Sequence, residues 1–163
     1  MATRAWPRRI GAADYVLGMA ILASLWAVAA WLTCRSTMVL GLLAGLGHDA
    51  LSWLLLAYGL GVLLLSWPLA ESRMRDLDLP VQTMLLLLRI PFTAPLVWMA
   101  LCRPAGARRD NDHGAAPAPS GVLKRCAALA TACVAASLLV FAGAACVDAQ
   151  SALAAAAAAR LSA

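Results

Sequence analysis

Three long runs of apolar residues limit what this chain can fold into. They cover residues 15–33, 50–69 and 126–147. A helix rises about 1.5 Å per residue, so the first run alone would be roughly 28 Å long, close to the hydrocarbon thickness of a bilayer. The sequence therefore predicts an all-α integral membrane protein with three transmembrane helices, and membrane lipid is its first expected partner.

Composition agrees with lipid as the main solvent. Of the 163 residues, 63% are hydrophobic and 13% are charged, and the mean hydropathy is +0.81. Soluble domains contain about 45–50% apolar and about 25% charged residues. These values exclude an ordinary soluble enzyme, a disordered chain and a disulfide-stapled secreted miniprotein. The net charge of +5 does not indicate nucleic-acid binding, because the basic residues flank the apolar runs.

A further apolar segment, residues 79–102, is interrupted near its middle by Arg89, Pro91 and Pro95. Proline removes a backbone donor and clashes with the preceding helical turn, and an arginine at the bilayer centre is costly. We therefore expect this segment to be re-entrant or interfacial. The alternative is a fourth transmembrane helix.

The pattern divides the chain into three parts. Residues 1–102 form an N-terminal membrane region, 103–125 a mobile basic linker rich in proline, glycine and alanine, and 126–163 the last span with an alanine-rich tail helix. Residues 38–47 are expected to be a short apolar connection, and the charged residues 71–78 a polar loop. The first run exceeds the apolar core of a signal peptide, so we expect it to be retained as an anchor.

The distribution of positive charge favours one orientation. With three spans, ten Lys and Arg residues fall on the N-terminal side and two on the other, with Arg89 uncounted; four spans give six against six. Cytoplasmic loops carry an excess of positive charge. The expected location is a bacterial inner membrane with the N-terminus in the cytoplasm.

Arg89 is one candidate functional residue. An ionisable side chain inside an apolar segment marks a functional site by default, because a partner or a wet cavity must offset its cost. Two structural roles compete with that reading. Arg89 could extend to the phosphate layer from a shallow helix, or it could pair with one of four carboxylates: Asp14, Glu71, Asp76 or Asp78.

His48 and Asp49 form the second candidate, because a histidine beside an acid could relay protons. One His and one Asp do not complete a metal site, and a polar helix start in water is the simpler explanation of the two residues. No metal, cofactor or catalytic motif is predicted from the spacing of the other polar residues. Without a nucleophile–base pair, the sequence gives no reason to expect an enzyme.

Cys34 and Cys146 end the first and last spans on the same predicted outer face. Cysteines exposed to a bacterial periplasm meet an oxidising environment. A disulfide between them requires the two spans to be neighbours, since the Cα atoms must come within about 7 Å. Two unpaired thiols are the alternative.

Two functional classes remain open from the sequence. Small residues such as those of the Gly41–Gly45 pair allow helices to approach closely, within this chain, with other membrane subunits or with a second copy. That pattern favours an accessory, assembly or scaffolding subunit of a larger membrane complex. The alternative is a small oligomeric transport protein with Arg89 in the path.

The charge count leads to a prediction about topology. Residues 1–10, 71–78 and 103–125 should lie in one compartment, with 35–49 and 148–163 opposite. A reporter that is active on one side only should give the same signal when fused after Asp78 and after Gly114. Opposite signals would mean that residues 79–102 cross the membrane.

Overall fold

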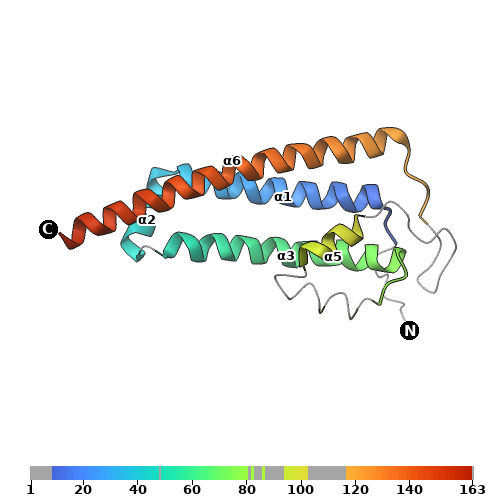
Figure 1. The fold of residues 1–163 in the computed structure, drawn as a ribbon, viewed down its shortest axis with the longest axis horizontal. Coiled ribbons are helices and arrows are strands. Elements are labelled where there is room, and N and C mark those ends of the chain that lie inside the picture. The colour runs from blue at the N-terminus through green and yellow to red at the C-terminus, as the bar shows by residue number, and fades with distance from the viewer. Residues whose placement is uncertain are drawn as a thin grey trace. The chain divides into compact units, whose positions relative to one another are not determined.

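In the structure, a computed structural model, the described residues form helices joined by short turns and connections, and no strand occurs among them. The described residues are 9–47, 49–80, 82, 86, 94–102 and 117–162. Figure 1 labels the helices, which are α1 (Ala12–Arg35), α2 (Thr37–Leu46), α3 (Ala50–Asp76), α5 (Ala94–Leu101) and α6 (Val122–Leu161). The prediction of an all-α protein is confirmed. In the segment 79–102, which was expected to be re-entrant or interfacial, residues 81, 83–85 and 87–93 lie outside the described residues.

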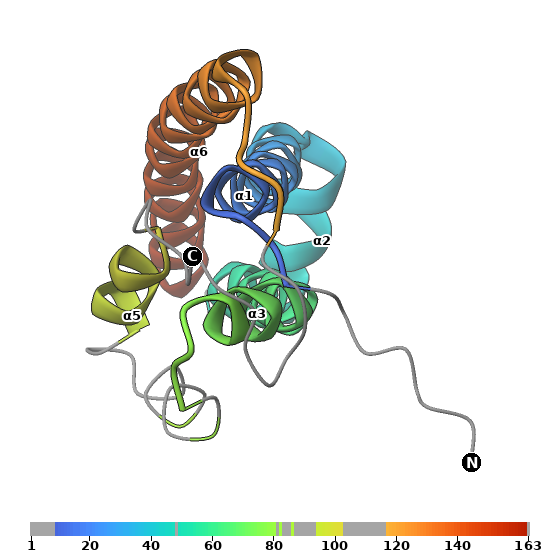
Figure 2. The same cartoon turned by 90° about the vertical axis from the view of Figure 1, so that its right-hand side faces the viewer.

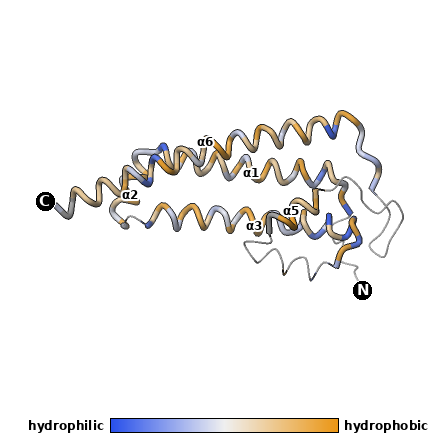
Figure 3. The backbone as a smooth tube through the Cα atoms, in the orientation of Figure 1, coloured by the Kyte–Doolittle hydropathy of each residue, from blue (hydrophilic) through white to orange (hydrophobic). Residues whose placement is uncertain are grey.

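Helices α1, α3 and α6 are long and apolar enough to cross a membrane. They contain 24, 27 and 40 residues, which correspond to about 36, 40 and 60 Å. Figure 3 shows apolar residues along most of each helix, with hydrophilic residues concentrated towards helix ends. The three apolar helices predicted from the sequence are therefore present, and α6 joins the last expected span and the alanine-rich tail in one helix.

The apolar connection expected at residues 38–47 is itself a helix, α2, separated from α1 by Ser36. The Ser36 hydroxyl accepts a hydrogen bond from the amide of Val39 at 3.3 Å, which caps the new helix. Gly47 ends it with a φ of +118°, and its amide donates to the carbonyl of Leu43 at 3.2 Å. Figure 2, which views the long helices end-on, shows α2 as a separate element beside α1.

The prediction of a polar loop at 71–78 is wrong for most of its length, because α3 continues to Asp76. The helix ends in a Schellman motif: the amide of Leu79 donates to Met74, and that of Asp78 donates to Arg75. Asp78 takes the left-handed position with a φ of 55°, which aspartate tolerates better than most residues. Charge alone therefore did not end this helix; the turn after Leu77 did.

The chain divides into two units, and each is described by itself. Unit 1 consists of Met1–Ala20 and Ser66–Ala132, and unit 2 of Ile21–Leu65 and Cys133–Ala163. Each long helix contributes residues to both units. The core of unit 1 contains these buried residues: Tyr15, Ala70, Met74, Val97 and Leu101.

Unit 2 is built around two clusters of buried residues. One joins Cys34, Leu43, Leu51, Ala145, Ala149 and Leu153, and the other joins Ala27, Ala30 and Ala142. Many of these side chains are small, so the helix backbones approach closely where they meet.

Two polar contacts add to the apolar packing of unit 2. The hydroxyls of Thr33 and Tyr58 lie 3.3 Å apart, and Thr33 also donates to the carbonyl of Ala29 at 2.9 Å. Because a hydroxyl has one proton, Tyr58 is the donor in the first of these contacts. The Gln150 amide donates to the Ser52 hydroxyl at 3.3 Å. These bonds connect α3 to the end of α1 and to the later part of α6.

Candidate functional site

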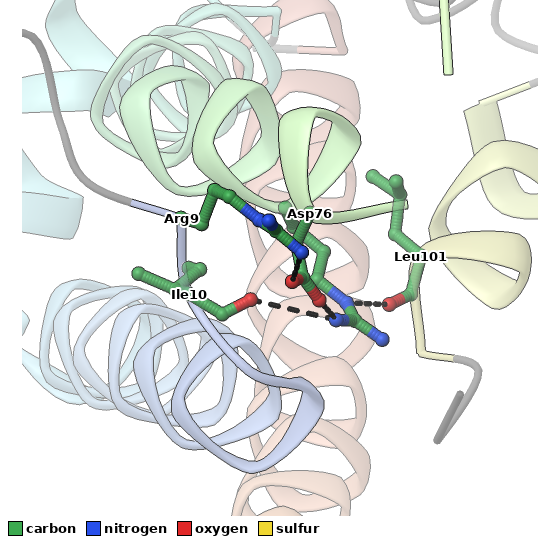
Figure 4. A network of polar contacts seen from close by, with 5 residues as sticks. Arg9, Ile10, Asp76 and Leu101 are labelled. Atoms are coloured by element: carbon green, nitrogen blue, oxygen red, sulfur yellow. Dashed lines mark hydrogen bonds and ion pairs between the residues drawn. The ribbon is translucent and has the colours of Figure 1, made fainter. Parts of the chain in front are cut away.

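The polar centre of unit 1 is the carboxylate of Asp76, which lies between two arginines. Its Oδ1 is 3.1 Å from a terminal nitrogen of Arg9, and its Oδ2 accepts from Arg73 on the same helix. Figure 4 shows Asp76 facing Arg9 across the interior of the unit. One carboxylate thus connects the segment before α1 to the last turn of α3.

Arg73 extends this network to the backbone of two other segments. Its Nε donates to the carbonyl of Leu101 at 3.0 Å, and Nη1 approaches the carbonyl of Ile10 at 3.4 Å (Figure 4). Leu101 is the last residue of α5, where carbonyls lack a partner within the helix and the helix dipole favours a cation. Arg73 therefore satisfies an orphan carbonyl of α5 while it neutralises Asp76.

All three charged side chains are removed from solvent. The exposed fractions are 6% for Arg9, 0% for Arg73 and 1% for Asp76. Burying ions costs several kcal/mol each unless close pairing and further hydrogen bonds offset the loss of water. One carboxylate is shared by two guanidiniums, so the carbonyls of Leu101 and Ile10 that accept from Arg73 are part of what makes this burial tolerable.

Two more ion pairs surround the network at more exposed positions. Arg75 pairs with Glu71 one helical turn earlier, in the order that favours an i,i+4 pair. Lys124 in the first turn of α6 pairs with Asp14 in the first turn of α1, and both side chains are about 40% exposed. Pairs as exposed as this last one contribute at most about 1 kcal/mol. The last pair nevertheless places the beginnings of α1 and α6 side by side.

Tyr15 and Cys102 lie close to Arg73 in the same unit. The Tyr15 hydroxyl is buried and has no hydrogen-bond partner among the described residues. Partial desolvation raises the pKa of the Cys102 thiol, and the nearby Arg73 guanidinium opposes that shift. Cys102 is therefore a protonated thiol at neutral pH. Arg73, Asp76 and Arg9 thus join the end of α3 to the segment before α1 and to the end of α5.

The structure describes one of the three polar candidates from the sequence. Asp49 lies directly before α3, and its carbonyl accepts from the amide of Trp53 at 3.1 Å, as expected at a helix start. Arg89 and His48 lie outside the described residues, so their roles remain predictions.

Three of the four carboxylates proposed as partners for Arg89 have other partners. Asp76 pairs with Arg9 and Arg73, and the two remaining pairs are Glu71 with Arg75 and Asp14 with Lys124. Each of these carboxylates is thus neutralised by a cation within the described chain.

Sequence reasoning missed the network because it assigned residues 71–78 to a solvated loop. A signal was present: Ala70, Arg73, Met74 and Leu77 follow the i, i+3, i+4, i+7 spacing of one buried helix face. Arg73 occupies a core position in that pattern, and Asp76 one turn later can neutralise it. The spacing did not show that Arg9 would supply the second cation.

Cys34 and Cys146 are brought together in unit 2, where their Sγ atoms are 3.0 Å apart. Both cysteines have free thiols in the structure. A disulfide between these cysteines requires the first and last spans to be neighbours, and at these two residues they are. The disulfide itself stays a prediction.

Comparison with known proteins gives no further information on this chain. No protein-family model matches the sequence, and no curated protein or solved structure matches it either. Within the described residues, no three His, Cys, Asp or Glu side chains gather where they could hold a metal ion.

The network predicts unequal effects of removing two carboxylates on the same helix. Asp76→Asn removes the buried carboxylate that two buried guanidiniums share and should lower the free energy of unfolding by about 3–5 kcal/mol. The matched change Glu71→Gln removes the same charge from a more exposed pair and should cost about 0.5 kcal/mol. Thermal unfolding of the detergent-solubilised protein measures both, and equal losses would contradict the central role of Asp76.

Proposed function

We propose that this protein is a three-span protein of a bacterial inner membrane, with its N-terminus in the cytoplasm, that acts as an accessory, assembly or scaffolding subunit of a larger membrane complex. The observation that carries the proposal is the open space beside several glycines in its helices. At Gly59 and Gly61 in α3 and at Gly143 in α6, an added Cβ would meet nothing within 4 Å. Gly41 and Gly45 in α2 are equally open.

Gly18 shows what a glycine used within the chain looks like. A Cβ at this position would lie 2.9 Å from a terminal methyl of Leu69, so the absence of a side chain is what lets Leu69 pack there. A glycine costs a helix about 1 kcal/mol relative to alanine. At the open glycines, no neighbour among the described residues packs against the flat surface, which favours a helix of another chain as the neighbour.

The surface of α3 beside two of these glycines has the shape that helix packing requires. Trp53, Leu56, Leu60 and Leu64 are each more than half exposed and fall on one helical face. Gly59 and Gly61 lie on either side of this ridge. The glycines leave grooves beside the row of large side chains, and the side chains of a neighbouring helix can pack into such grooves. In a bilayer, lipid covers whatever part of the face a partner subunit leaves free.

Contacts within unit 1 support the proposed topology. The beginning of α1, the end of α3 and the beginning of α6 are linked by the Arg9–Asp76 and Lys124–Asp14 pairs. Three spans with residues 79–102 returning to the same side require these ends to lie together. The positive-inside rule then assigns them to the cytoplasm. The alternative transport function depends on Arg89, and no contact of the described residues favours it.

Purification tests the subunit proposal. The tagged chain, extracted gently from its native membrane, should co-purify with other membrane proteins in fixed proportion. Gly143→Leu should lower their recovery at least tenfold without lowering the thermal midpoint of the isolated chain, because a Cβ added at that position meets no neighbour within 4 Å among the described residues. Val140→Leu, at an exposed position of the same helix, should retain the partners. Recovery of this chain alone from the native membrane would contradict the proposal.

A further inference from the structure

Two cysteines far apart in the sequence meet in unit 2. Cys34 lies in the last turn of α1 and Cys146 in α6, 112 positions later, with 3.0 Å between their sulfur atoms. Cys34 is 4% exposed and Cys146 is half-buried. A disulfide bond is about 2.0 Å long, so a small side-chain movement brings the sulfurs to bonding distance.

The packing one helical turn earlier makes this approach possible. Ala30 precedes Cys34 by four residues, Ala142 precedes Cys146 by four residues, and both alanines are fully buried in one cluster. Methyl side chains at both positions let the backbones of α1 and α6 come close together. A disulfide requires such closeness, because it joins Cα atoms within about 7 Å. The cysteines continue this small-residue contact by one turn.

The other three cysteines differ from this pair in their surroundings. Cys102, Cys126 and Cys133 are exposed. Cys126 and Cys133 lie on α6 itself, two turns apart, so they provide controls on the same helix. The juxtaposition of one buried and one accessible thiol is therefore specific to Cys34 and Cys146.

We propose that Cys34 and Cys146 form a redox pair, which is closed to a disulfide by exchange with a disulfide-carrying thiol oxidoreductase. The Cys146 thiolate, the more accessible of the two, attacks the donor disulfide, forms a mixed disulfide and releases one donor thiolate. The Cys34 thiolate then attacks the sulfur of Cys146, closes the Cys34–Cys146 bond and releases the second donor thiolate. Two cysteine thiols are oxidised, one donor disulfide is reduced to a dithiol, and the two protons end on the donor.

The bond would fasten the end of α1 to α6 and leave the charge network of unit 1 untouched. The positive-inside rule places this end of α1 on the periplasmic side, where disulfide donors of this class operate. The pairing depends on contacts inside this chain and not on the subunit function, whereas its oxidation rests on the periplasmic location that the proposed topology gives this end of α1.

Counting free thiols in acid-quenched membranes tests the proposal. The chain has five cysteines, so a mass-adding maleimide should attach three times without reductant and five times after reduction. Cys34→Ala and Cys146→Ala should each give four adducts in both conditions. The control Cys133→Ala should give two adducts before reduction and four after it.

Mass spectrometry of the unreduced full-length protein identifies the bond and needs no variant. A peptide pair joining Cys34 to Cys146 is the expected result. The purified protein is then reduced and exposed to oxidised glutathione, as a small disulfide donor, which should regenerate the same pair. Five adducts without reductant, both in native membranes and after this treatment, would overturn the proposal. A linked pair that involves Cys102, Cys126 or Cys133 instead would overturn it as well.

Discussion

The long helices of this chain bury little of their apolar surface against one another. In the most apolar stretches of α1, α3 and α6, the buried shares are 22%, 11% and 17%. In hydrocarbon, a helix satisfies its own backbone hydrogen bonds and needs no apolar core of the chain's own. The rest of the structure is consistent with this: small residues make most of the buried contacts between helices in unit 2, and the proposed function assigns the remaining apolar surface to lipid or neighbouring subunits.

The bilayer constraint also determines how much could be predicted from the sequence. Runs such as 15–33 and 126–147 predict α1 and α6 because bilayer thickness fixes the length that a span needs. The end of α3 was missed, because the charged residues after Glu71 indicate a loop when each charge is assumed to face water. Burial of Arg73 depends on Asp76 three residues later and on Arg9, 64 positions earlier. No local pattern encodes that distant partner.

The two units use polar groups in different ways. In unit 1, Asp76 holds two buried arginines and thereby fixes the segment before α1, the end of α3 and the end of α5. In unit 2, buried alanines of α1 pack against Ala142 of α6, and the thiols of Cys34 and Cys146 meet beside this contact. The open glycines of α2, α3 and α6 belong to neither arrangement. The glycine surfaces therefore lie apart from the contacts that hold each unit together internally. This is the physical basis for proposing a subunit of a larger complex.

Spin labels along α3 of the isolated chain in lipid vesicles test the central claim, that this helix crosses the bilayer; without partner subunits its large exposed side chains should face lipid. Labels at Trp53, Leu56, Leu60 and Leu64 all occupy exposed positions. Collision with oxygen should be greatest at Leu60 and fall in both directions, while collision with a water-soluble nickel complex should show the reverse. Equal access of the nickel complex to all four labels, or an oxygen profile without a maximum, would contradict a transmembrane α3.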